Sequence, residues 1–160
     1  MNKYIKLVSV VTMAFILGSC TKQTIGPLMD LRPNIPVTVA NAVDYRPDPT
    51  VSTSKSGGGI IQIILTIPTG LGRTIKEITK VSASTNYALV QSAAGAYNSA
   101  PIPGSGVSVT FNTSLSEYVT KGPGVVPAAN SELAKRFFFI ITLDDNSTIV
   151  SMPTRVLVLN

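Results

Sequence analysis

The stretch Ile60-Ile61-Gln62-Ile63-Ile64-Leu65-Thr66-Ile67 decides the fold class of this chain of 160 residues. β-Branched residues dominate the stretch, and Gly59 and Pro68 bound it. Its length fits a strand and is too short for an ordinary helix. We predict that it forms the central core strand of a β-sheet.

Weaker strand patterns lie on both sides of this stretch. They cover 36–40, where Val37 and Val39 share one face, 74–84 with a bulge, 87–90 at an edge, 107–111, 137–143, 148–152 and 155–159. Residues 144–147 are turn formers and predict a hairpin between 137–143 and 148–152. About seven short strands predict an all-β chain, in the form of an immunoglobulin-like or fibronectin-like β-sandwich.

The segments between these strands are predicted from their turn residues. Ser52 to Gly59 is expected to be a turn region and Ser92 to Gly106 a loop. Ser114 to Thr120 is expected to form a turn or a crossing strand. Residues 130–135 carry a capping residue and good helix formers, which predicts one helical turn.

Residues 1–20 have the layout of a secretory signal peptide. Lys3 and Lys6 precede an apolar run from Leu7 to Leu17, which is about half of the roughly 20 residues that span a bilayer as a helix. The end of this segment, Leu17-Gly18-Ser19-Cys20, closely resembles the lipobox of bacterial lipoproteins. The resemblance implies that the Cys20 thiol receives a diacylglycerol, that the signal is cut before it, and that the new amine takes a fatty acid such as palmitate.

Three regions follow from this reading: a signal peptide at 1–19, a lipidated Cys20 with a tether to residue 35, and a single β domain at 36–160. The segment Thr21-Lys22-Gln23-Thr24 bears on sorting. In lipoproteins of bacteria with polysaccharide-utilisation systems, surface export is associated with a Lys followed by acidic residues, and only the Lys is present here. We therefore expect an outer-membrane protein facing the periplasm, with the cell surface left open.

The signal segment with its lipobox and the strand-rich domain resemble those of the small accessory lipoproteins of outer-membrane nutrient-uptake systems. That likeness implies a membrane partner through the lipid on Cys20, and either an outer-membrane protein complex or a glycan as a second partner. The leading expectation is a non-enzymatic interaction or structural module. A glycan-binding protein is the alternative, and a carboxylate-based hydrolase is the least favoured reading.

Composition removes several classes of chemistry. The net charge of +5 falls to +3 once Lys3 and Lys6 leave with the signal, and the basic residues are scattered, which argues against nucleic-acid binding. Cys20 is the one cysteine and histidine is absent, so internal disulfides, His or Cys zinc sites and Ser-His or Cys-His pairs are excluded. We expect no metal, no cofactor and no enzymatic activity.

Some weak candidates for chemistry remain. The acid pairs Asp144 with Asp145 and Asp44 with Asp48 favour turns over calcium, because a calcium site wants oxygens spaced along a loop. The possible hydrolase carboxylates are Glu77, Glu117 and Glu132. Ser54-Lys55, beside Gly57 to Gly59, fits a flexible turn better than a Ser-Lys nucleophile.

Aromatic platforms for a sugar are the last candidates. Tyr45, Tyr97 and Tyr118 lie near predicted loops and could stack against a sugar ring. The competing interpretation is that such tyrosines close the ends of a β-sandwich.

Overall fold

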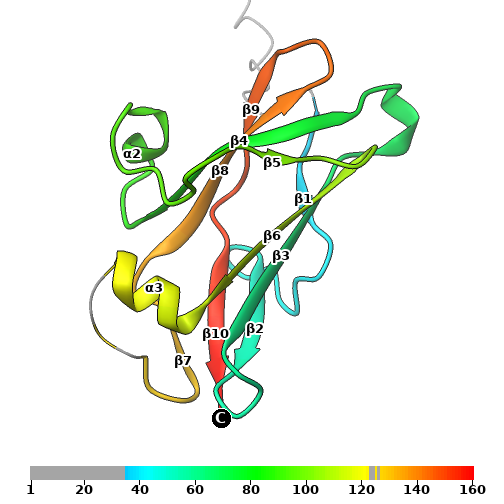
Figure 1. Cartoon of the computed structure of the whole chain (residues 1–160). Coiled ribbons are helices and arrows are strands. Elements are labelled where there is room, and N and C mark those ends of the chain that lie inside the picture. Colours follow the sequence, from blue (N-terminus) through cyan, green and yellow to red (C-terminus); the bar gives the residue numbers. More distant parts are fainter. Residues whose placement is uncertain (1–34, 123–124, 126) are drawn as a thin grey trace, which may run out of the picture. The chain divides into compact units, whose positions relative to one another are not determined.

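The computed structural model describes residues 35–122, 125 and 127–160. Within these residues the chain is mostly β, with ten strands, two short α-helices and one 3-10 turn. The strands form three sheets (Figure 1). The predicted β class is confirmed.

The first sheet is built on the stretch that decided the fold class. Strand β3 (Ile60–Thr66) lies between β1 (Thr38–Val39) and β6 (Ser108–Ser114), and both pairings are antiparallel. The central position is confirmed. Burial along β3 alternates: Ile61, Ile63 and Leu65 are fully buried, whereas Ile60 is 65% exposed. The sheet therefore turns one face of β3 to the core and leaves part of the other to solvent.

The second sheet has β4 (Ile75–Ser84) and β8 (Arg136–Leu143) as its central antiparallel pair. Outside them lie β5 (Ile102–Pro103) on β4 and β9 (Thr148–Val150) on β8. The register between β4 and β8 shifts twice near the start of β4, so the predicted bulge is confirmed. The predicted hairpin is confirmed too, because β8 and β9 are joined by a turn in which Asn146 has a φ of 64°.

The third sheet joins distant parts of the chain. Strand β10 (Arg155–Leu159) lies between β2 (Thr50–Ser54), which runs parallel to it, and β7 (Ser131–Glu132), which runs antiparallel. The predicted final strand is confirmed. Its apolar run is not buried throughout: Val156 and Val158 lie in the core, and Leu159 is 38% exposed.

The prediction of a turn from Ser52 to Gly59 is wrong in its first half. Strand β2 runs to Ser54, and the turn begins at Lys55. The serines and threonines of β2 gave no strong strand pattern by themselves. Pairing with β10 supplies their backbone partners, and Val51 and Thr53 are buried.

The predicted edge strand at 87–90 is wrong, because α2 (Ala88–Gln91) occupies this place. The Asn86 side chain accepts a hydrogen bond from the Ala88 amide at 2.9 Å. Val90 is fully buried against the second sheet. A short apolar run is equally compatible with a strand or a buried helical turn, and packing on the sheet decided between them.

Two further segments differ from expectation. Residues 115–121 form α3 (Leu115–Lys121), neither a turn nor a strand. The predicted helical turn at 130–135 is absent from the described structure, where Asn130 has a φ of 58° and β7 pairs with β10. The 3-10 turn η1 (Thr69–Leu71) precedes β4.

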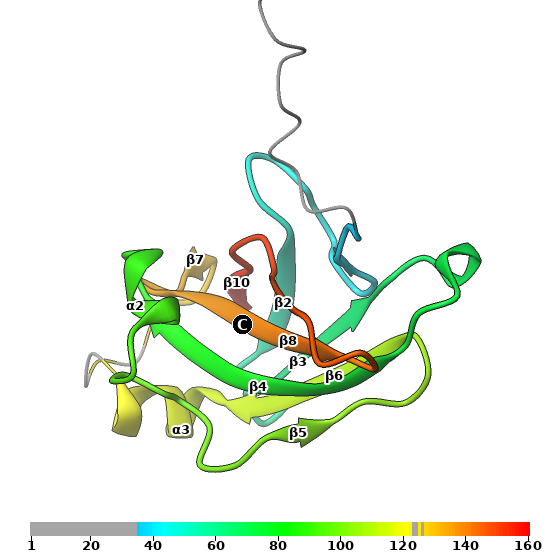
Figure 2. The ribbon, with the colours of Figure 1, turned by 90° about the horizontal axis from the view of Figure 1, so that it is seen from above.

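Aromatic rings join the first two sheets. Phe111 of β6 packs against Phe137 and Phe139 of β8, with ring centroids 5.4 and 5.5 Å apart. Tyr97, from the loop after α2, meets Phe111 and Phe137 edge to face. Figures 1 and 2 show α2 and α3 toward the same side of these strands. The region between the two helices is where the candidate site lies.

Candidate functional site

The three predicted tyrosines are not brought together as a stacking platform. Tyr97 is 7% exposed and Tyr118 is fully buried, so both rings belong to the core. Tyr45 is 54% exposed, and its hydroxyl donates to the Val39 carbonyl at 2.6 Å. Burial therefore removes two of the three rings proposed for sugar binding.

Tyr97 instead begins a hydrogen-bonded chain that reaches α3. Its hydroxyl lies 2.7 Å from the Thr113 hydroxyl, which donates to Glu117 at 2.8 Å. Because Thr113 has a single proton and gives it to Glu117, Tyr97 is the donor to Thr113. The Lys121 amine completes this hydrogen-bond network, because it donates to Glu117 at 2.6 Å and to the Tyr97 carbonyl at 2.8 Å.

The electrostatics of this network follow from its partners. Lys121 lies 4.7 Å above the Tyr97 ring centroid, close enough for a cation–π contact. The hydrogen bond from Lys121 lowers the pKa of the Glu117 carboxyl. Burial raises the pKa of the Tyr97 hydroxyl, so it remains a proton donor at neutral pH. The network fixes the loop after α2 to α3.

Lys80 of β4 also holds the loop after α2, through hydrogen bonds to backbone carbonyls. Its side chain is nearly buried, and its amine donates to the carbonyls of Leu89 at 3.1 Å and Ala94 at 2.7 Å, and also to that of Ser92. These carbonyls belong to the end of α2 and the residues after it. A lysine in the sheet thus fastens a segment with little regular structure.

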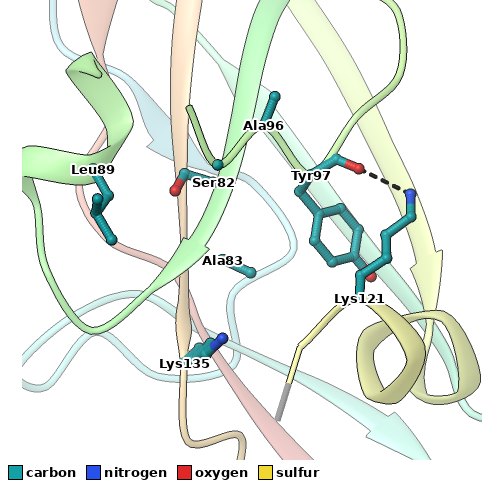
Figure 3. Close-up of a pocket in the computed structure, with 8 residues that line it drawn as sticks. Ser82, Ala83, Leu89, Ala96, Tyr97, Lys121 and Lys135 are labelled. Atoms are coloured by element: carbon teal, nitrogen blue, oxygen red, sulfur yellow. Dashed lines mark hydrogen bonds between the residues drawn. The ribbon is translucent and has the colours of Figure 1, made fainter. Parts of the chain in front are cut away.

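Between α2, the loop after it and α3 lies a half-open cavity of about 420 Å³ (Figure 3). This volume lies in the range of small-molecule sites. The lining residues are Ser82, Ala83, Leu89, Gly95, Ala96, Tyr97, Lys121 and Lys135. Alanine and leucine side chains supply apolar wall, and two lysines supply charge.

The two lysines are held differently. Lys121 is neutralised by Glu117, whereas no ion pair joins Lys135 to any carboxylate in the described part of the chain. The backbone amide of Lys135 donates to the buried Tyr118 hydroxyl at 2.9 Å. Figure 3 places the Lys135 side chain on the wall below Ala83. Tyr118 therefore anchors the residue that brings unpaired positive charge to the cavity.

A second, smaller cavity of about 240 Å³ lies beside Tyr118 and β7. Its lining residues are Tyr118, Val125, Pro127, Ser131, Glu132 and Ala134. The carboxylate of Glu132 is paired with Arg155 of β10. Its charge is already matched, so the larger cavity is the stronger candidate.

The predicted acid pairs take part in turns and ion pairs. Arg73 contacts both Asp144, at 2.8 Å, and Asp145, and its hydrogen bonds lower the pKa of both carboxyls. Asp44 accepts from the amides of Tyr45 and Arg46, and the first of these bonds lowers the pKa of its carboxyl. The turn interpretation describes these residues better than the calcium one.

The remaining acids do not converge. Asp48 pairs with Arg136 at 3.1 Å. Glu117 pairs with Lys121 and Glu132 with Arg155, while Glu77 accepts a hydrogen bond from Thr79 at 3.4 Å. Among the described residues, no group of three or more His, Cys, Asp or Glu side chains is arranged to hold a metal ion.

Ser54 ends β2 and Lys55 begins the turn that follows it. The Ser54 hydroxyl donates to the Asn160 carbonyl at 2.8 Å and accepts from the Gly57 amide at 3.1 Å. The Lys55 amide donates to the Leu159 carbonyl. These bonds fasten the turn to the end of β10.

The lipobox residues Leu17, Gly18, Ser19 and Cys20 lie outside the described residues. In the part of the chain that is described, no helix is long and apolar enough to span a membrane. Sequence reasoning did not select Lys80, Lys121 or Lys135. Only Lys121 had a local signal, because Glu117 precedes it by one helical turn.

Comparison of the chain with protein-family models, curated proteins and solved structures finds no match.

Proposed function

We propose that this chain is a lipid-anchored protein of the bacterial cell envelope, in which Cys20 carries the lipid and the β domain is a non-enzymatic interaction module. The observation that carries the anchor is the sequence Leu17-Gly18-Ser19-Cys20 after a basic start and a short apolar run. One acyl chain binds a membrane only marginally, whereas several together bind stably. A triacylated Cys20 would therefore hold the protein firmly.

The proposed location is the outer membrane, facing the periplasm, with the cell surface as the alternative. Lys22 without following acids supports this order of preference. The proposed partner, besides the membrane, is an outer-membrane protein complex. The tether from Cys20 to residue 35 would let the domain reach up to about 50 Å from its lipid if extended.

We propose further that the domain is a β-sandwich of the immunoglobulin or fibronectin type. Two antiparallel pairs, β3 with β6 and β4 with β8, support this assignment, because side chains from both meet in one core. The parallel pairing of β2 with β10 is a departure from a purely antiparallel arrangement.

The use of the charged residues supports an interaction module over an enzyme. Among the described residues, the ion-paired carboxylates are spread over five basic side chains, and two of them, Asp144 and Asp145, share Arg73; the other partners are Arg46, Lys121, Arg136 and Arg155. An acid catalyst needs a raised pKa, and where a carboxyl pKa here departs from its ordinary value it is lowered.

Metabolic labelling with an alkyne analogue of palmitate tests the anchor. The full chain is expressed in a bacterial host, and the label should appear on the wild-type protein and be lost from Cys20→Ala, because the thiol is the attachment point. Ser19→Ala is the matched control. It keeps a small residue before the cysteine and should label like the wild type.

Label that persists in Cys20→Ala, or a wild-type protein that takes up no label, would overturn the proposed anchor. Fractionation of the same cells shows whether the protein is in the inner or the outer membrane. Recovery of the labelled protein with the inner membrane would contradict the proposed location.

A further inference from the structure

We propose that the cavity between α2 and α3 binds a small organic monoanion, a carboxylate on a compact apolar body. This inference deepens the proposed interaction module by naming the chemistry of what it binds. It does not depend on the lipid at Cys20. The argument rests on charge, on the walls of the cavity and on its fixed geometry.

The charge of the cavity is close to one positive unit. Its lining contains two lysines and no carboxylate among the described residues. Glu117, outside the lining, already balances Lys121. Lys135 remains without an acidic partner in the described ion pairs, so a single negative charge would complete the balance. Glu77 lies on β4 about five residues from Ser82, or roughly 16 Å along the strand, too far to supply that charge.

The walls favour a ligand with an apolar body. Leu89 of α2 lines the cavity and is 45% exposed, and Ala83 and Ala96 add methyl groups. Ser82, which is 2% exposed, belongs to the same lining. Figure 3 shows Leu89 and Lys121 on opposite sides of the cavity, with Ala83 and Lys135 between them and below.

The frame around the cavity is held before any ligand arrives. Lys80 holds the end of α2 and the loop after it through three backbone carbonyls. The hydrogen-bond network described above holds the same loop to α3; its members are Tyr97, Thr113, Glu117 and Lys121. The Tyr118 hydroxyl fixes the backbone of Lys135. Preorganised walls reduce the ordering cost of binding.

Ligand-observed ¹⁹F NMR with 4-fluorobenzoate tests the proposal, using the purified full chain mixed with nanodiscs of neutral lipid, whether or not it is anchored in them, and the nanodiscs alone as the blank. The probe line should broaden with the protein. The neutral isostere 4-fluorobenzamide should bind about tenfold more weakly, because it cannot form a charge-assisted bond to Lys135. Equal binding of the two probes, or no broadening of benzoate up to about 10 mM, would overturn the proposal.

Three variants locate the site. Lys135→Met should weaken benzoate binding about tenfold, and Lys135→Arg should stay within about threefold of the wild type, because it keeps the charge. Lys55→Met is the matched control, since Lys55 lies on the turn before β3 and does not line the cavity; it should change nothing. Wild-type affinity in Lys135→Met, with its thermal unfolding unchanged, would contradict the assignment.

Lipid labelling and benzoate binding are read separately. If the protein takes up no lipid label but still binds benzoate, only the proposed anchor is contradicted. If it takes up the label but does not bind benzoate, only the proposed ligand class is contradicted.

Discussion

Lys80 shows how one side chain can organise a loop that lacks regular structure. Its side chain runs from β4, where Lys80 pairs with Ile140 of β8, to three backbone carbonyls. Lysines are seldom buried without a partner, because removing an ammonium from water is costly. Here three backbone carbonyls replace the water around the ammonium group.

We predict that Lys80→Met loosens this loop. Methionine keeps the apolar stem and removes all three hydrogen bonds, so the free energy of unfolding should fall by about 1–3 kcal/mol. Amide hydrogen exchange should speed up most between Leu89 and Ala94. Mass spectrometry of exchange and a urea titration measure the two effects.

Lys55→Met serves as the control for this substitution, because no side-chain hydrogen bond of Lys55 occurs in the described structure. Its stability should stay within about 0.5 kcal/mol of the wild type. Unchanged exchange at 89–94 in Lys80→Met would show that the lysine does not hold the loop.

The three tyrosines show that residue type and a place near a predicted loop do not predict whether a side chain is buried. Tyr45, Tyr97 and Tyr118 all lie near loops in the sequence, yet one is half exposed and two are core residues. The difference arises from distant partners: Thr113 for Tyr97 and Lys135 for Tyr118. Tyr97 and Tyr118 pack in the core, and that they close the ends of a β-sandwich stays a prediction.

At the scale of elements, the sequence before α3 contains a helix-start signal, although a turn or a crossing strand was predicted there. Ser114-Leu115-Ser116-Glu117 has the Ser-x-x-Glu spacing of a helix start. In the structure the Ser114 hydroxyl accepts a hydrogen bond from the Glu117 amide at 3.1 Å. The Glu117 carboxylate bonds Thr113 and Lys121, so it serves the network more than the cap.

We predict that Ser114→Ala lowers the free energy of unfolding by about 1 kcal/mol through loss of this cap. Ser116→Ala is the matched control on the same helix. Ser116 is exposed and its side chain makes no hydrogen bond in the described structure, so the change should be near zero or slightly stabilising. Urea unfolding of the full chain compares the two. Equal stabilities of the two variants would contradict a capping role for Ser114.

The local signals at 87–90 and 130–135, an apolar run and a capping residue with helix formers, predicted the wrong elements. Each contains residues that fit a helix or a strand, and the neighbouring sheet made the choice. Strand β10 recruits β7 as an antiparallel partner, while Lys80 and the buried Val90 hold α2 on the second sheet. Their secondary structure is therefore a consequence of tertiary contacts.

At the scale of the whole molecule, the lowered carboxyl pKa values link stability to pH. The pKa values of Glu117, Asp144 and Asp145 lie below their ordinary values of 4.5 and 3.8 in the folded protein. The unfolded chain thus binds protons more readily than the folded one. The stabilisation is present above the ordinary values and is lost as the pH falls through the folded values.

We therefore predict that the thermal midpoint falls as the pH is lowered from about 7 to about 3. Glu117→Gln should have a shallower fall, because that carboxyl no longer titrates. Glu77→Gln is the control, since Glu77 contacts no basic side chain in the described ion pairs, and it should keep the wild-type slope. Differential scanning calorimetry in matched buffers gives the midpoints. A midpoint that rises on acidification would contradict the assignment of these acids.

The sequence by itself determined the β class, the central strand at 60–67, the bulged strand at 74–84 and the hairpin near the end. Their side-chain patterns and turn residues act over a few neighbouring positions, so they can be read locally. The tertiary structure alone decided that Thr50–Ser54 is a strand, that Ala88–Gln91 is a helix, and that Lys121 and Lys135 share a cavity. Those outcomes depend on contacts between residues far apart in the chain, where burial and hydrogen bonding outweigh local preference.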